Sequence, residues 1–149
     1  MKVLINEVNP GTVYKGKISD YWISGILENG KEIEIFDFIP YDLRKYVNMK
    51  VECLIIPLIA DINTSIKDIK DTNLIGTYLG KYTIPSKWKK KRRSWYFKLI
   101  LKKELVAIKT YDGVFIISSD YIKNFNIKKG DELYLKVGRY DLVAWHQIE

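Results

Sequence analysis

Apolar and polar residues alternate along much of the chain with the two-residue period of strands. The clearest case is a hairpin of residues 21–28 and 31–36. Its turn is Asn29-Gly30, a pair that suits the positive φ angles of a tight two-residue turn. Further strands are expected over residues 11–18, 51–59, 74–84, 95–101, 105–110, 114–117, 132–137 and 141–145.

Two short helical segments interrupt these strands. The first covers residues 41–47 and follows Pro40, a residue that suits the first position of a helix. The second covers residues 118–125, where Ser119 or Asp120 can cap the N-terminus. The pattern therefore predicts a mainly β protein with one short helix in each half.

Polar residues 61–73 separate the two halves and are the best linker candidate. We therefore expect a first domain over residues 1–60 and a second, basic β-rich domain over residues 74–149. Asp112-Gly113 predicts a second hairpin, between residues 105–110 and 114–117. Each half thus has a hairpin, a strand, a short helical piece and another strand, an order that suggests duplication. In a sequence of such biased composition, similarity between the two halves can also arise by chance.

The chain has 149 residues, of which 47% are hydrophobic, so it is long enough for one ordinary domain or two very small ones. It has no apolar stretch of the roughly 20 residues that a membrane crossing needs, and no secretory signal is visible. Cys53 is the single cysteine, which excludes an internal disulfide. We expect a cytoplasmic protein without a membrane partner.

The formal net charge of +7 is unevenly distributed. Residues 1–73 contain 9 Lys/Arg and 11 Asp/Glu, a net charge of −2. Residues 74–149 contain 16 and 7, a net charge of +9. This difference indicates that the second half meets a polyanion, although it also fits two halves that are simply solvated differently.

Residues 10–60 resemble oligonucleotide-binding (OB) domains of the S1 type. The resemblance rests on Gly11-x-Val13, on the run from Gly25 to Gly30, and on Ile33-x-Ile35. It implies a small barrel, and such barrels often bind oligonucleotides.

Residues 109–143 resemble the swapped-hairpin AbrB-like DNA-binding proteins, through the runs 113–118 and 127–133. Ser118 stands where that family usually has Pro. Both resemblances imply small barrels with nucleic-acid roles. The expected fold is therefore mainly β, with two small β-barrel-like halves that are OB-like or related.

The segment 87–96 carries the sharpest candidate chemistry. Six of the seven residues 87–93 are cations, and phosphates can neutralise such a cluster while counterions are released. Aromatic rings beside them can stack on exposed bases. The candidate nucleic-acid-binding residues are Lys87, Trp88, Lys89, Lys90, Lys91, Arg92, Arg93, Trp95 and Tyr96.

Three interpretations of this segment stay open. It can bind single-stranded DNA or RNA, dock on an acidic protein surface as an inhibitor or interaction module would, or form a solvated hairpin. Tyr21 and Trp22 belong either to the core or to a second stacking platform. Lys15 and Lys17 could extend a basic strip.

The sequence does not carry an enzyme signature. His146 is the single histidine, and nothing in the sequence orients it beside a nucleophile. Cys53 lies in an apolar run and is expected in the core. One His and one Cys cannot build a structural zinc site, and no Gly-rich phosphate loop is present. Glu32 and Glu34 alternate on one face of a strand, and a nuclease or glycosidase that uses only carboxylates stays open as an alternative. We expect no catalytic residues, no metal and no cofactor.

Overall fold

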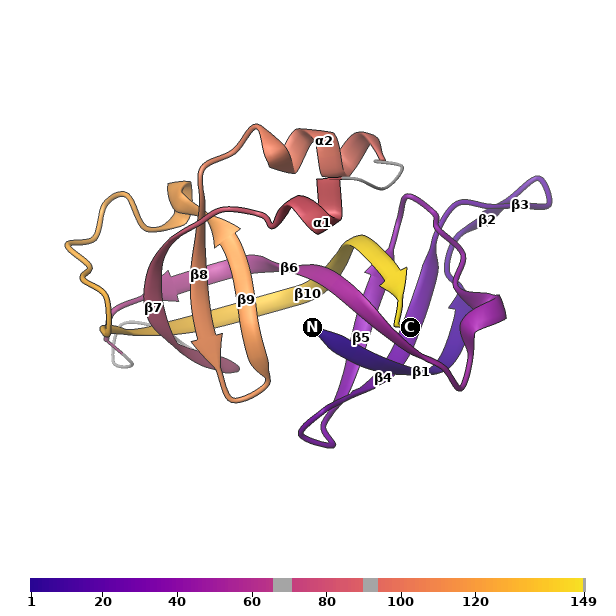
Figure 1. Ribbon diagram of the computed structural model, residues 1–149, viewed down its shortest axis with the longest axis horizontal. Coiled ribbons are helices and arrows are strands. Elements are labelled where there is room, and N and C mark those ends of the chain that lie inside the picture. Colours follow the sequence, from indigo (N-terminus) through magenta and orange to yellow (C-terminus); the bar gives the residue numbers. More distant parts are fainter. Residues whose placement is uncertain (66–70, 90–93, 149) are drawn as a thin grey trace. The chain divides into compact units, whose positions relative to one another are not determined.

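The computed structural model describes residues 1–65, 71–89 and 94–148 (Figure 1). Strands dominate the fold, as the sequence pattern predicts. The strands are β1 (Lys2–Pro10), β2 (Val13–Tyr14), β3 (Lys17–Ile18), β4 (Tyr21–Leu27), β5 (Glu32–Asp37), β6 (Lys50–Asn63), β7 (Leu74–Tyr82), β8 (Leu105–Thr110), β9 (Gly113–Ser118) and β10 (Glu132–Gln147). The helical pieces are η1 (Arg44–Tyr46), α1 (Ser86–Lys89), α2 (Trp95–Leu101) and η3 (Ser119–Tyr121).

The chain forms two compact units. Unit 1 contains Met1–Ile55 together with Arg139–Glu149, and unit 2 contains Ile56–Gly138. The division differs from the expected one at residues 60 and 74, because β6 and β10 each continue from one unit into the other. The expected linker, residues 61–73, falls within unit 2, where its residues 66–70 lie outside the described residues.

Unit 1 is a five-stranded barrel. β4 pairs antiparallel with both β1 and β5, and β1 also pairs antiparallel with β6. β10 is a neighbour of β6 and pairs in parallel with β5 through Tyr140–Ile35 and Asp141–Phe36. The strand order β1-β4-β5-β10-β6 therefore returns to β1, which is the closure of an OB-like barrel.

Unit 2 uses its strands in the same way. β7, β8 and β9 form an antiparallel meander (Figure 1), and β10 pairs antiparallel with β7. β6 is the neighbour of β10 on its other side. In each unit, a three-stranded meander is followed by a short 3₁₀ turn and then by a long strand that pairs with the first strand of the meander. The repeated order that the sequence suggests is thus present in the fold.

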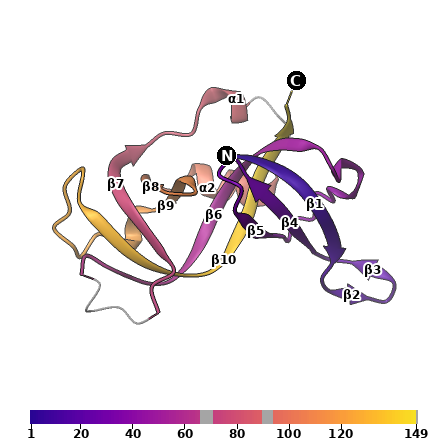
Figure 2. The ribbon, with the colours of Figure 1, turned by 90° about the horizontal axis from the view of Figure 1, so that it is seen from below.

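The two units differ in the connection between their first two strands. In unit 1 this connection is the β2–β3 hairpin, which projects beyond β1 and β4 in both views (Figures 1 and 2). In unit 2 it is residues 83–104, which include α1 and α2. The basic segment 87–93 belongs to this longer connection.

Alternation of side chains explains how each barrel acquires its core. In unit 1 the inward residues Val3, Ile5, Ile23 and Ile35 are fully buried. In β8 and β9 of unit 2, neighbouring residues are buried in succession, from Leu105 to Ile108 and from Phe115 to Ile117. Both faces of this part of the hairpin are therefore covered.

Both predicted hairpins are confirmed, at Asn29-Gly30 and at Asp112-Gly113. Other expectations were wrong. β1 was not expected, although its Val3 and Ile5 alternate with more exposed residues. The expected strands 132–137 and 141–145 form one strand, β10.

The two predicted helices shrink to the 3₁₀ turns η1 and η3. Residues 109–143, which resemble AbrB-like proteins, span parts of both units and do not form a compact body of their own. Among the helices that the structure describes, none has the length and apolar character that a membrane crossing requires.

A buried carboxylate organises the turn after β5. Asp37 is completely buried and accepts hydrogen bonds from the backbone N–H groups of Tyr41 (2.9 Å) and Asp42 (3.0 Å). The Tyr41 hydroxyl donates to the carbonyl of Val143 at 2.6 Å and so ties this turn to β10. Burial raises the pKa of Asp37, and the backbone hydrogen bonds oppose that rise.

Replacing Asp37 with Ala is expected to lower the free energy of unfolding by about 1–3 kcal/mol, because two N–H groups lose their acceptor. Asp37→Asn retains one acceptor oxygen and should cost less. Urea titration followed by circular dichroism measures both, with the exposed Glu7→Ala as the control. An Asp37→Ala protein as stable as the wild type would contradict this role.

Candidate nucleic-acid interface

The segment after the basic run is a helix, so the expectation of a strand over residues 95–101 was wrong. Ser94 caps α2, and its hydroxyl oxygen accepts the N–H of Phe97 at 3.0 Å. Phe97 and Ile100, three residues apart, are buried on one side of the helix. The run Trp-Tyr-Phe-Lys-Leu-Ile-Leu fits in part both the two-residue period of a strand and the 3.6-residue period of a helix. The Ser94 cap favours the helix.

The opposite side of α2 is open to solvent and carries both aromatic and cationic groups. Trp95 is 60% exposed, and its ring lies 5.8 Å from that of the half-buried Tyr96, at an interplanar angle of 69°. Lys98 and Lys102 are exposed on the same short helix or directly after it. The Trp95 ring is therefore accessible to a flat ligand, whereas the ring of its neighbour Tyr96 is half-buried.

Trp88 is placed differently from the expectation. It lies in α1 and is only 4% exposed, with its backbone N–H bonded to the carbonyl of Pro85 at 3.1 Å. The exposed Lys87 holds its ammonium group 5.8 Å from the centre of the Trp88 ring. A base cannot stack on a ring that is already buried, so the assignment of Trp88 as a stacking residue was wrong.

The rest of the candidate segment is placed only in part. Lys89 is the last residue of α1. Lys90, Lys91, Arg92 and Arg93 lie outside the described residues, and their role stays a prediction from sequence.

The division into units sharpens the charge distribution. Unit 2 contains 17 Lys/Arg and 8 Asp/Glu, a net charge of +9. Unit 1 contains 8 and 10, a net charge of −2. All of the excess positive charge of the chain therefore belongs to unit 2.

A second group of aromatic residues lies on unit 1 and was mostly missed from the sequence. Trp22 is 38% exposed, and its ring centre is 4.7 Å from that of Phe36. Phe38 and Arg139 belong to the same group. The alternation of residues 31–36 could have indicated this group. Ile33 and Ile35 form the apolar side of that strand, so Phe36 falls on the polar side, where an aromatic ring is unusual.

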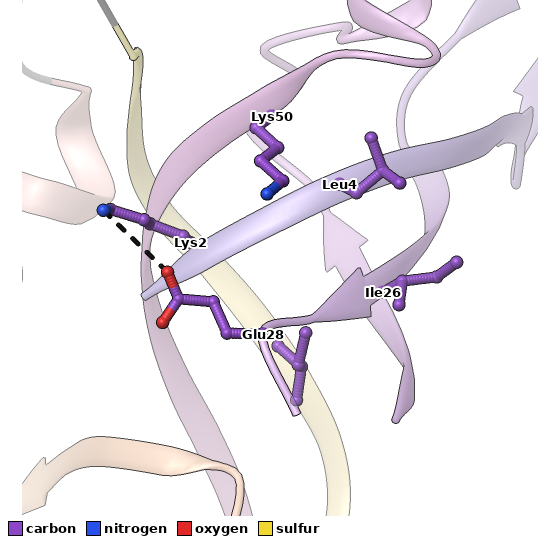
Figure 3. Close-up of a pocket in the computed structure, with 6 residues that line it drawn as sticks. Lys2, Leu4, Ile26, Glu28 and Lys50 are labelled. Carbon is purple, nitrogen blue, oxygen red and sulfur yellow. Dashed lines mark ion pairs between the residues drawn. The ribbon is translucent and has the colours of Figure 1, made fainter. Parts of the chain in front are cut away.

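A shallow hollow of about 210 Å³ on unit 1 is a weaker candidate (Figure 3). Leu4 and Ile26 line it together with the charged Lys2, Glu28 and Lys50 (Figure 3). Lys2 pairs with Glu28 at 3.9 Å, and both side chains are more than half exposed. An ion pair so exposed to solvent contributes little to stability. The negative charge of Glu28 also disfavours the binding of an anion in this hollow.

No cluster of three or more His, Cys, Asp or Glu residues suited to a metal ion occurs among residues 1–65, 71–89 and 94–148. His146 contacts Glu52, with Nε2 and Oε2 3.0 Å apart. Glu52 and the buried Cys53 are successive residues of β6, so their side chains leave on opposite faces of the strand.

Comparisons with known proteins show the fold and no family. No protein-family model matches the chain, and no curated protein does. Among solved structures, it is similar to the cytoplasmic molybdate-binding protein ModG, in a crystal form with molybdate bound. The two chains are 11% identical, with a TM-score of 0.50, and the match covers 99% of this chain and 94% of that one.

At this identity the similarity shows the fold alone. The protein is mainly β and contains two small OB-like barrels, which confirms the predicted fold class.

Exchanging Trp88 or Trp95 for Ala separates a buried ring from an exposed one. We expect Trp88→Ala to lower the free energy of unfolding by about 3–5 kcal/mol, because a large buried side chain is lost. Trp95→Ala should change it by less than about 1 kcal/mol. Urea denaturation of the two variants checks this, and equal destabilisation would contradict the placement of the rings.

The Cys53 thiol is expected to be inert while the protein is folded. Burial raises the pKa of Cys53 to about 12, so that about one thiol in 10⁴ is ionised at pH 8. A chromogenic disulfide reagent should react with the protein only after urea unfolds it. Rapid reaction of the native protein would show that Cys53 is accessible.

Proposed function

We propose that the protein is a non-enzymatic nucleic-acid-binding protein whose unit 2 contacts single-stranded DNA or RNA. The observation that carries this proposal is the concentration of charge, with +9 on unit 2 and −2 on unit 1. A surface with this excess of cations attracts a polyanion and gains free energy when the counterions of the polyanion are released.

The position of the basic segment supports the proposal. Residues 87–93 connect the first and second strands of an OB-like barrel. In OB folds this connection and the face of the second and third strands bind oligonucleotides. Residues 105–108 of β8 and 115–117 of β9 are buried in succession, so this part of the strand face is covered, whereas Lys87 and Trp95 of the connection are exposed.

The described residues give the contact its chemistry. Lys87, Lys98 and Lys102 are exposed around the segment and can neutralise phosphates. Trp95 presents an exposed ring on which a base can stack. The contact therefore combines a sequence-independent grip on the backbone with stacking on one ring.

A second candidate function is the binding of a small oxyanion. The similarity to a molybdate-binding protein across 99% of the chain favours this class. The 11% identity transfers no binding residues, and the hollow of Figure 3 contains a carboxylate. We therefore rank this function second.

The nucleic-acid proposal predicts steep salt dependence. Fluorescence anisotropy of a labelled single-stranded oligonucleotide should show affinity falling between 50 and 200 mM salt. Replacing Lys90, Lys91 and Arg92 with Ala should reduce the slope of log K against log salt by about 2, at about 0.7 per phosphate contact. Replacing the exposed Lys31, Lys45 and Lys50 of unit 1 removes the same charge and should leave the slope unchanged.

The alternatives give different results. No salt-sensitive anisotropy change at low ionic strength would overturn the proposal. Calorimetric binding of molybdate in that case would favour the oxyanion function. Stable capture of a protein partner through the same three cations, without oligonucleotide binding, would favour docking on an acidic protein surface.

A further inference from the structure

The outer face of β4 and β5 in unit 1 carries a row of aromatic rings. Trp22 and Phe36 are paired in register across the two strands, with ring centres 4.7 Å apart and tilted by 38°. Phe38 continues the row, 5.9 Å from Phe36 and tilted by 31°. The inward neighbours Ile23 and Ile35 are fully buried, so the rings of Trp22 and Phe36 face away from the core.

Arg139 of β10 covers part of this row. Its guanidinium carbon lies 4.7 Å from the centre of the Phe36 ring and 5.9 Å from that of Phe38. Arg139 Nε is 2.7 Å from Oδ1 of the buried Asp141, a contact that fixes the plane of the guanidinium. The Arg139 side chain is still 38% exposed, so it can stack on a further flat group.

The β2–β3 hairpin extends this face at the Trp22 end. A Cβ atom at Gly11, where the hairpin begins, would lie 3.4 Å from the Trp22 ring. Tyr14 is 70% exposed, and the ammonium of Lys15 lies 5.4 Å from the centre of its ring. The hairpin therefore brings an aromatic ring and two cations, Lys15 and Lys17, to the same end of the sheet.

We propose that Trp22, Phe36, Phe38 and Arg139 form a stacking platform for the bases of a single-stranded nucleic acid. The inference rests on the proposed function and deepens it by assigning base contacts to unit 1. Flat rings with an exposed guanidinium favour nucleobases, and such stacking is tolerant of sequence because every base has a π face.

The charges around the platform indicate how it acts. Glu34 lies on the same face and accepts the hydroxyl of Ser24 at 2.7 Å, and Asp141 is paired with Arg139. Unit 1 as a whole has a net charge of −2. The platform therefore adds base affinity with little salt dependence, whereas unit 2 provides the salt-dependent contact with phosphates.

The test compares two oligonucleotides with equal phosphate charge. One is single-stranded oligothymidylate of about 12 nucleotides, and the other is an abasic strand of the same length. The wild type should bind the base-bearing strand about 5- to 150-fold more tightly for each stacked base. The double variant Trp22→Leu/Phe36→Leu keeps apolar cover but removes the flat rings, and most of this ratio should disappear.

The control variant is Tyr111→Leu, which removes an 88% exposed ring of unit 2. It should retain the ratio, and urea titration establishes that both variants are folded. The slope of affinity against salt should be unchanged in the Trp22→Leu/Phe36→Leu protein. A wild-type ratio in that protein would overturn the platform and leave the proposed function intact.

The two readouts separate the two proposals. A salt slope near zero with a persistent ratio of base-bearing to abasic affinity would overturn the contact by unit 2 and support the platform. Binding of a neutral oligosaccharide in place of the oligonucleotide, lost in the Trp22→Leu/Phe36→Leu variant, would overturn the assignment to nucleobases.

Discussion

The parallel pairing of β5 with β10 is the interaction on which unit 1 depends. Ile35 and Phe36 meet Tyr140 and Asp141, and this ladder closes the barrel that β1, β4 and β6 leave open. It also brings Arg139 over the ring of Phe36. Both the closure of the barrel and the composition of its outer face thus follow from one pair of strands.

Local signals predicted the elements that need no distant partner. The two hairpins follow from Asn29-Gly30 and Asp112-Gly113, because turn geometry is set by neighbouring residues. The extent of β10 could not be predicted, because the two expected strands 132–137 and 141–145 are joined into one by pairing with the distant strands β7 and β5. The same limit applies to the units, whose boundaries fall inside β6 and β10.

The positive charge of the candidate site could be predicted from the sequence, but the positions of its side chains could be predicted only in part. Counting charges locates the basic half, since charge adds along the chain whatever the fold. The fate of each tryptophan depends on the side of a helix on which it falls, so Trp88 is buried while Trp95 is exposed. Phe36 and Arg139 lie far apart in sequence, and only the β5–β10 pairing makes them neighbours.

The chain passes between the two units inside strands, and this affects how the protein folds. Ile35 and Tyr140 pair across 105 positions, so the first barrel cannot close until the chain of the second has been synthesised. Contacts of such long range carry a large entropy of loop closure and slow the folding reaction. During that interval the edge of β5 is without its β10 partner, and an unpaired strand edge is in general a template on which another chain can pair.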